Sequence, residues 1–186
     1  MTTGLKLVTP SGEHIPSYLM ALRRGWSWGP HPSWKSEQIK AIEADQDGYL
    51  QGLSDPEAKG QDIQLPDGSV VARTPSFYRW IWDGEFCGLV HLRWQVGTTE
   101  LPPMYKGHIG YSVVHWKQRR GYAKYALQAL LPEAKALGLP YVEVVTDTDN
   151  VPSLIVIKAN GGVLMGEYPR QPNDGENIYL RFRIML

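Results

Sequence analysis

Alternating apolar and polar positions, rich in aromatic and β-branched residues, predict seven β-strands along this chain. The clearest pair is a hairpin within residues 76–95, because Asp83-Gly84 supplies the positive φ angles that a tight two-residue turn needs. The expected strands cover residues 5–8, 77–82, 85–96, 108–114, 141–146, 163–168 and 178–185.

Four other segments begin with a capping residue or end at a helix-stopping residue, which predicts helices. Ser11 and Ser36 are the expected N-caps of the first two, and Gly138 and Gly161 end the last two. The expected helices cover residues 11–24, 36–50, 118–137 and 151–160. Polar, Gly- and Pro-containing stretches predict loops at residues 25–33, 52–75 and 171–177.

The resulting order, βααβββαβαββ, predicts an α/β protein with a central sheet flanked by helices. The strand at 108–114, the helix at 118–137 and the strand at 141–146 form a βαβ unit. We therefore expect these two strands to be parallel, with a right-handed crossover. The length of 186 residues suits a single domain over residues 1–186.

Composition narrows the functional classes. Nineteen basic residues balance nineteen acidic ones, which disfavours a dedicated nucleic-acid binder. Cys87 is the only cysteine, so a reducing compartment fits best, and its apolar neighbours favour a buried, unreactive thiol. Without a signal-peptide pattern or an apolar run of about 20 residues, we expect a cytoplasmic protein with no membrane partner. The five histidines have no metal-ligand spacing, so we expect no metal.

The segment Gln118-Arg119-Arg120-Gly121-Tyr122-Ala123 stands where a strand gives way to a helix. The first turn of a helix has unpaired N–H groups and a positive dipole end, and both favour binding of a phosphate. Gly121 lets the backbone approach that anion closely, and Lys124 adds positive charge. An ordinary helix start with solvated arginines is an equally good interpretation of this hexapeptide alone.

The surrounding residues resemble the GNAT acyltransferase superfamily. Gln118, Gly121 and Ala123 match its phosphate-loop pattern Q/R-x-x-G-x-G/A, and residues 109–114 (IGYSVV) look like its preceding strand. The spacing of a further set of residues resembles the following helix of that family; the set is Asn150, Ser153, Lys158, Gly161 and Gly162. The resemblance implies a GNAT-like α+β fold with a mixed, mostly antiparallel sheet that splits between strands 108–114 and 141–146.

The resemblance also implies an acetyl-CoA-dependent N-acetyltransferase with acetyl-CoA as co-substrate. It implies that backbone groups of Val113, Val114 and His115 bind the pantetheine arm. The pyrophosphate would be held by Gln118, Arg119, Arg120, Gly121, Tyr122, Ala123 and Lys124. Asn150 and Ser153 would contact the pantetheine or the end of the cofactor. The acceptor would be an amine of a small molecule or peptide, with no nucleic-acid partner, and a homodimer remains open.

Catalytic roles are harder to predict. The family often places a tyrosine seven residues after the Asn as general acid, and here that residue is Ile157. A thiolate with a pKa of about 8.5 leaves without strong assistance, so Ser153 or a water could replace the tyrosine. The candidate bases are His108, Tyr111, His115, Glu143 and Asp147, of which we favour Glu143 and His115.

Two other interpretations remain open. Ile157 is compatible with a non-catalytic CoA-binding sensor or interaction module. The stretch Trp26-Ser27-Trp28-Gly29-Pro30 could line an acceptor pocket, although aromatic residues more often pack a loop against the core.

Overall fold

The computed structural model describes residues 4–28, 33–64, 68, 70–168 and 177–186. Its helices are α1 (Ile15–Arg23), α2 (Trp34–Ala44), α3 (Gln46–Gln51), α4 (Tyr122–Ala136) and α5 (Val151–Ala159), with short 3-10 helices at Gly12–His14 and His115–Lys117. Its strands are β1 (Lys6–Val8), β2 (Ser54–Asp55), β3 (Ile63–Gln64), β4 (Val70–Val71), β5 (Ser76–Trp82), β6 (Phe86–Arg93), β7 (Ile109–Val113), β8 (Tyr141–Asp147), β9 (Val163–Glu167) and β10 (Tyr179–Met185). The prediction for residues 29–32 and the predicted turn at 171–176 lie outside the described residues.

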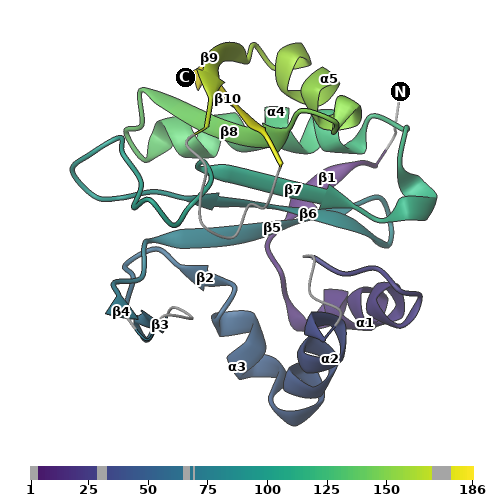
Figure 1. Ribbon diagram of the computed structural model, residues 1–186. Coiled ribbons are helices and arrows are strands. Elements are labelled where there is room, and N and C mark those ends of the chain that lie inside the picture. The colour runs from purple at the N-terminus through teal and green to yellow at the C-terminus, as the bar shows by residue number, and fades with distance from the viewer. Residues whose placement is uncertain (1–3, 29–32, 65–67, 69, 169–176) are drawn as a thin grey trace.

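Within the described ranges, the strands form a five-stranded sheet, a three-stranded sheet and a separate two-stranded hairpin. The larger sheet has the order β1-β5-β6-β7, with β2 also paired to β5, and the smaller one has the order β8-β10-β9. In Figure 1, α1, α2 and α3 lie below the larger sheet and α4 lies above it. This arrangement confirms the predicted sheet flanked by helices.

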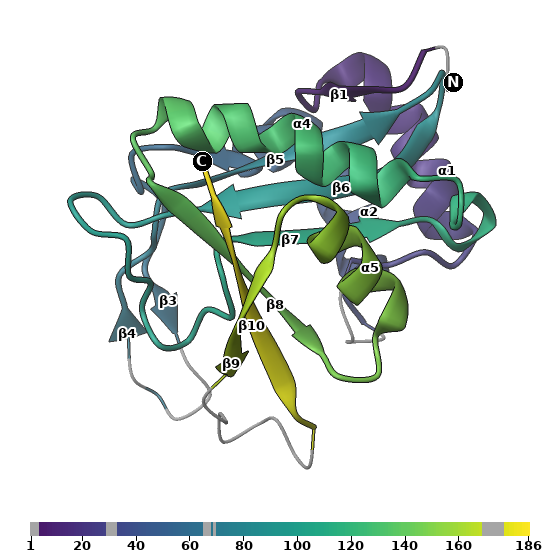
Figure 2. The same cartoon turned by 90° about the horizontal axis from the view of Figure 1, so that it is seen from above.

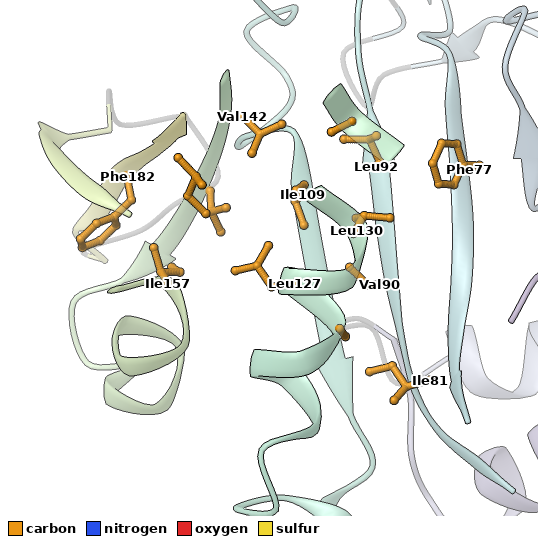
Figure 3. Packing of buried hydrophobic residues seen from close by; sticks show 14 of the residues in the cluster. Phe77, Ile81, Val90, Leu92, Ile109, Leu127, Leu130, Val142, Ile157 and Phe182 are labelled. Atoms are coloured by element: carbon orange, nitrogen blue, oxygen red, sulfur yellow. The ribbon is translucent and has the colours of Figure 1, made fainter. Parts of the chain in front are cut away.

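Two apolar cores follow from this layering. The first lies between the larger sheet, α4 and the smaller sheet. Figure 3 shows Leu130 of α4 beside Val90 and Leu92 of β6, and Leu127 on the side of α4 toward Ile157. The second lies on the other sheet face, where α1 packs Tyr18 and Leu22 against Trp80 and Phe86. Trp26 also belongs to this second core.

The sheet splits between β7 and β8, as expected. The two strands meet only near their starts, where His108 N donates to Glu143 O at 2.7 Å and Gly107 bridges Val144. Figure 2 shows that both strands then run in the same general direction but diverge. Gly107 has φ +81°, and a Cβ there would lie 2.8 Å from Glu143 O. A glycine at this position therefore permits the close approach from which the two sheets separate.

The N-terminal third differs from the predicted elements. The expected helix 36–50 is two helices, because Asp45 adopts φ −154° and its carboxylate accepts from Gly48 N at 2.9 Å as the cap of α3. Ser36 lies inside α2 rather than at its cap, and Ser11 makes no capping hydrogen bond. The expected loop at 52–75 contains β2, β3 and β4, whose two-residue strands are too short to give an alternating pattern.

The hairpin of β5 and β6 is confirmed, but its turn is longer than predicted. Trp82 pairs with Phe86, so Asp83, Gly84 and Glu85 form the turn, and the register shifts beside Ile81. The extra residue brings the Asp83 and Glu85 side chains to Lys117, beside the predicted phosphate loop.

None of the helices in the described part of the chain combines the length and apolar character needed to cross a bilayer.

Candidate active site

The divergence of β7 and β8 opens a cavity of about 980 Å³. Its walls come from β7, the segment that leads into α4, the end of β8 and the first turns of α5. Trp28, which follows α1, also lines it. A pocket of this size is within the range that holds a small-molecule ligand or cofactor.

The free edge of β7 faces this cavity. Arg93 N donates to His108 O at 2.9 Å, and Val114 N donates to Cys87 O at 2.9 Å. In an antiparallel pair, alternate residues direct both backbone groups at the partner strand. The backbone groups of Tyr111 and Val113 therefore point away from β6, toward the opening. Gln118 Nε2 donates to Val113 O at 3.2 Å, so the loop is joined directly to this edge.

The predicted helix start needs a correction of four residues. Gln118 lies in a loop and α4 begins at Tyr122, because Arg119 and Gly121 take left-handed conformations with φ +61° and +81°. The first intrahelical bond runs from Tyr125 N to Gly121 O at 2.9 Å. The backbone amides of the first turn that come before Tyr125 therefore have no intrahelical acceptor, and they can bind an anion.

A partly buried ion-pair cluster around Lys117 holds this loop in place. Lys117 Nζ lies 2.7 Å from Asp83 Oδ1 and 2.7 Å from Glu85 Oε1, and the Tyr122 hydroxyl donates to Asp83 Oδ2 at 2.7 Å. Partial burial opposes ionisation of Asp83, but hydrogen bonds from Lys117 and Tyr122 outweigh it and lower the pKa of Asp83 to about 2. Asp83 and Lys117 therefore stay ionised at neutral pH.

The sequence alone did not reveal this cluster. Asp83 and Lys117 are 34 residues apart, and only the tertiary fold brings them together. Cys87 contacts the cluster through Lys117 Nζ at 3.5 Å. Burial raises the pKa of the Cys87 thiol to about 12, which agrees with the expected unreactive thiol.

A second polar contact crosses the cavity. The Tyr111 hydroxyl lies 2.7 Å from Ser153 Oγ, so it joins β7 to α5. Asn150 Oδ1 accepts from Ser153 N at 3.2 Å and caps α5, which fixes the position of Ser153. Burial raises the pKa of Tyr111 to about 12, against a smaller opposite effect of the Ser153 hydrogen bond. Tyr111 is therefore protonated and can donate at neutral pH.

The structure brings most of the residues expected to bind the cofactor to this cavity. Those that line it are Val113, Gln118, Arg119, Gly121, Tyr122, Ala123, Lys124, Asn150 and Ser153. Val114, His115 and Arg120 do not line it. Both backbone groups of Val114 are already paired, with Cys87 O and Lys117 N.

The residues favoured as bases lie elsewhere. Glu143 forms an ion pair with Arg183 at 2.8 Å on the smaller sheet. His115 is exposed and packs edge-on against Trp116. His108 is buried, and its Nδ1 accepts from Glu143 N at 3.0 Å. Tyr111 and Asp147 are the two candidate bases that line the cavity.

Ile157 does not line the cavity either. It is fully buried in the first core, and a Cβ at Gly162 would lie 2.4 Å from its side chain. Among the described residues, no group of three His, Cys, Asp or Glu side chains is placed to hold a metal ion.

A sheet that splits beside the N-terminus of a helix is the architecture expected of an acyl-CoA-binding acyltransferase. The Acetyltransferase (GNAT) domain family matches residues 5–163 of this chain. The chain therefore belongs to the GNAT acetyltransferase family. A comparison with curated protein sequences finds no match.

Solved structures with the same fold include two kinds of acetyltransferase. RimL, a ribosomal L7/L12 α-N-protein acetyltransferase in complex with coenzyme A, gives a TM-score of 0.63 at 17% identity and covers 99% of this chain and 95% of its own. The Salmonella typhimurium enzyme that modifies the N-terminal serine of L7/L12 gives 0.58 at 17%, with 99% and 96% covered. The microcin C7 self-immunity acetyltransferase MccE, with acetyl-CoA and AMP, gives 0.62 at 14%, with 98% and 93% covered. At these identities the similarity establishes the fold.

Proposed function

We propose that this protein is an acetyl-CoA-dependent N-acetyltransferase of the cytoplasm, built as one domain over residues 1–186. One observation supports this most strongly: the first-turn amides of α4 and the free edge of β7 open into the same cavity of about 980 Å³. The free amides at the start of a helix can bind a diphosphate. A free strand edge can form hydrogen bonds with an amide-containing arm such as pantetheine.

The proposed cofactor contacts follow from this geometry. Gly121 and the amides that follow it would hold the pyrophosphate, with Arg119 and Lys124 adding positive charge. Val113 and Tyr111 would pair with the pantetheine through their outward backbone groups. The proposal leaves out Val114, whose backbone groups are both paired internally, and His115, which lies outside the cavity.

The proposed chemistry is direct attack of an unprotonated amine on the thioester carbonyl. A C–N bond forms, the negative charge on oxygen is stabilised by an outward N–H of β7, and the C–S bond then breaks. The Ser153 hydroxyl would donate its proton to the departing thiolate and regain one from the Tyr111 hydroxyl, 2.7 Å away, and water would then return a proton to Tyr111. The amine proton would leave to water.

The acceptor is proposed to be an α-amine of a small molecule or peptide. An α-amine has a pKa of about 8, so a useful fraction is unprotonated at neutral pH without a strong base, unlike a lysine amine with a pKa of about 10.4. The enzymes of similar fold described as acting on ribosomal L7/L12 modify such a group.

Two measurements test the proposal. Calorimetric titration with coenzyme A should show one binding site per chain. Incubation with acetyl-CoA and a panel of amines should release free thiol with at least one α-amine. Absence of coenzyme A binding would contradict the proposed function.

A second candidate function is a non-catalytic CoA-binding sensor. It is favoured by Ile157, which is buried in the core at the position where the family often has a tyrosine. Coenzyme A binding without thiol release across the whole amine panel would support the sensor over the enzyme.

A further inference from the structure

Arg93 is a partly buried cation at the end of β6. Its Nε donates to His91 Nε2 at 3.1 Å, and its guanidinium lies over the Tyr105 ring, 4.8 Å from the ring centre. Neither neighbour is a carboxylate. Burial lowers the pKa of Arg93 from its ordinary value, and Tyr78 and Tyr105 partly oppose that effect, but an arginine stays protonated.

Arg93 lacks the carboxylate partner that two other partly buried arginines have. Arg79 pairs with Glu133 at 2.6 Å, and Arg183 pairs with Glu143 at 2.8 Å. Within the described ranges, no Asp or Glu lies within ion-pair distance of Arg93. A partly desolvated cation without a counter-ion is unfavourable, and an anionic ligand would relieve this cost.

His91 is buried between Arg93 and the cavity, and neither His91 nor Arg93 lines the cavity itself. The His91 ring is stacked on Tyr78, with centroids 5.2 Å apart, and meets Trp28 edge-on at 5.1 Å. It also covers Gly110, where an added Cβ would lie 2.5 Å from the His91 ring and 3.2 Å from Trp28. Gly110 and Trp28 both line the cavity. Arg93, His91 and Trp28 therefore form a continuous series of side-chain contacts on the sheet face opposite α4, and this series begins at the cavity wall.

The strand register gives the approximate distance from Gly110 to Arg93. His91 lies opposite Gly110 on β7, and Arg93 follows two residues later, about 7 Å further along the strand. An acceptor amine bound beside Gly110 would therefore lie about 7 Å from Arg93 along the strand. One further residue together with its side chain spans about this distance.

We propose that Arg93 binds a carboxylate of the acceptor, so that the protein selects amines carrying a carboxylate about one residue away from the reacting nitrogen. This inference rests on the proposed function and deepens it by naming a substrate class. His91 positions the guanidinium, and Trp28 and Tyr78 pack against the His91 ring. A glutamate or aspartate next to an N-terminal residue has this chemistry, as does a small amino acid with an extended acidic chain.

A matched pair of product mimics tests the inference without turnover. Acetyl-Ala-Glu-amide and acetyl-Ala-Gln-amide differ only in charge and are titrated by calorimetry, with and without coenzyme A. The wild type should bind the Glu peptide about 10-fold or more tightly than the Gln peptide, as expected for charge-assisted hydrogen bonds. Equal affinities, or no detectable binding of either peptide, overturn the inference.

Variants assign the selectivity to Arg93. Arg93→Gln should bring the affinity ratio close to one, and Arg93→Lys, which keeps the charge, should retain part of it. Arg23→Gln removes an equal charge from an exposed ion pair with Glu43 and should leave the ratio unchanged. Coenzyme A affinity and the thermal unfolding midpoint confirm that each variant is folded. An unchanged ratio in a folded Arg93→Gln overturns the inference.

Measurements of turnover distinguish a failure of this inference from a failure of the proposed function. Thiol release is compared for Ala-Glu-amide and Ala-Gln-amide as acceptors, and kcat/KM should favour the Glu peptide by about 10-fold. Turnover of both peptides at equal rates overturns only the role of Arg93. Failure to bind coenzyme A overturns the proposed function, while the peptide titrations without coenzyme A still report on Arg93.

Discussion

Tyr111 on β7 and Ser153 on α5 place their hydroxyl oxygens 2.7 Å apart, and this contact crosses the cleft where the sheet splits. The two residues are 42 positions apart in the sequence. Ser153 is fixed by the cap that Asn150 provides, and Tyr111 is fixed by the strand. The pair therefore offers a protonated, positioned donor where Ile157 cannot.

Loss of this donor should slow the chemical step and leave cofactor binding unchanged. Ser153→Ala should lower kcat by about 100-fold, the lower end of the effect of a general acid, because a thiolate is already a fair leaving group. Tyr111→Phe should have a smaller effect, about 10-fold, because solvent can also return the proton to Ser153. Initial rates of thiol release measure both.

Tyr125→Phe is the matched control, since Tyr125 lies on α4 outside the cavity lining. It should behave as the wild type. A Ser153→Ala variant with an unchanged kcat would exclude the Tyr111–Ser153 pair as proton donor.

The proposed phosphate site predicts a large effect of substitution at Gly121. Gly121→Glu places a negative charge at the start of α4 and imposes a side chain on a residue with φ +81°. We expect coenzyme A affinity to fall by at least about 100-fold, because repulsion replaces attraction at the helix dipole. Calorimetric titration measures this change.

Gly138→Glu is the matched control, because it introduces the same charge and a similar backbone strain at a position away from the cavity. Gly138 has φ +82° at the other end of α4, with open space around it. The backbone cost of the two substitutions is therefore similar, about 1–2 kcal/mol, while only Gly121 lines the cavity. Equal coenzyme A affinities of the two variants would contradict the assignment.

The Asp83–Lys117 cluster predicts an acid-sensitive contribution to stability. The pKa of Asp83 is about 2 in the folded protein and near 3.8 without these contacts. Its contribution is therefore complete above about pH 4 and is lost as the pH falls toward 2. Asp83→Asn should lower the free energy of unfolding at pH 7 by about 3 kcal/mol, because it leaves the buried Lys117 charge without its main partner.

Urea unfolding at pH 7, 4 and 3 measures this effect. The loss of stability between pH 4 and pH 3 should be smaller in Asp83→Asn than in the wild type. Asp62→Asn, which removes an exposed carboxylate, should follow the wild-type curve. Parallel curves for Asp83→Asn and the wild type would show that the cluster does not titrate in this way.

Two buried histidines predict a second pH dependence near neutrality. Burial lowers the pKa of both His91 and His108, and nearby Arg93 lowers the pKa of His91 further. As the pH falls below about 6.5, the unfolded chain takes up protons that the folded chain does not. Each histidine should therefore reduce the free energy of unfolding by up to about 1.4 kcal/mol per pH unit.

His91→Gln should remove part of this slope between pH 6.5 and pH 5, measured by urea unfolding. The exposed His115 provides the control, and His115→Gln should leave the slope unchanged. A His91→Gln slope equal to that of the wild type would contradict the neutral, buried state of His91.

Local patterns predicted much of the fold because the predicted elements depend on interactions between residues that are close in the sequence. The strand around Ile109–Val113, the helix that follows Gly121 and the helix that ends before Gly161 depend on neighbours in the sequence, and all three occur in the structure. The break at Asp45 was missed because a single capping side chain decided it against the helical pattern.

The amino-acid sequence by itself determined the family, the order of the main strands and helices, and the loop that faces the cavity. Only the tertiary structure decided which polar side chains meet: Tyr111 with Ser153, Lys117 with Asp83, and Glu143 with Arg183 rather than with the cleft. These contacts join distant segments across the two sheets, so they depend on strand register and on the direction of each side chain, which no local pattern contains.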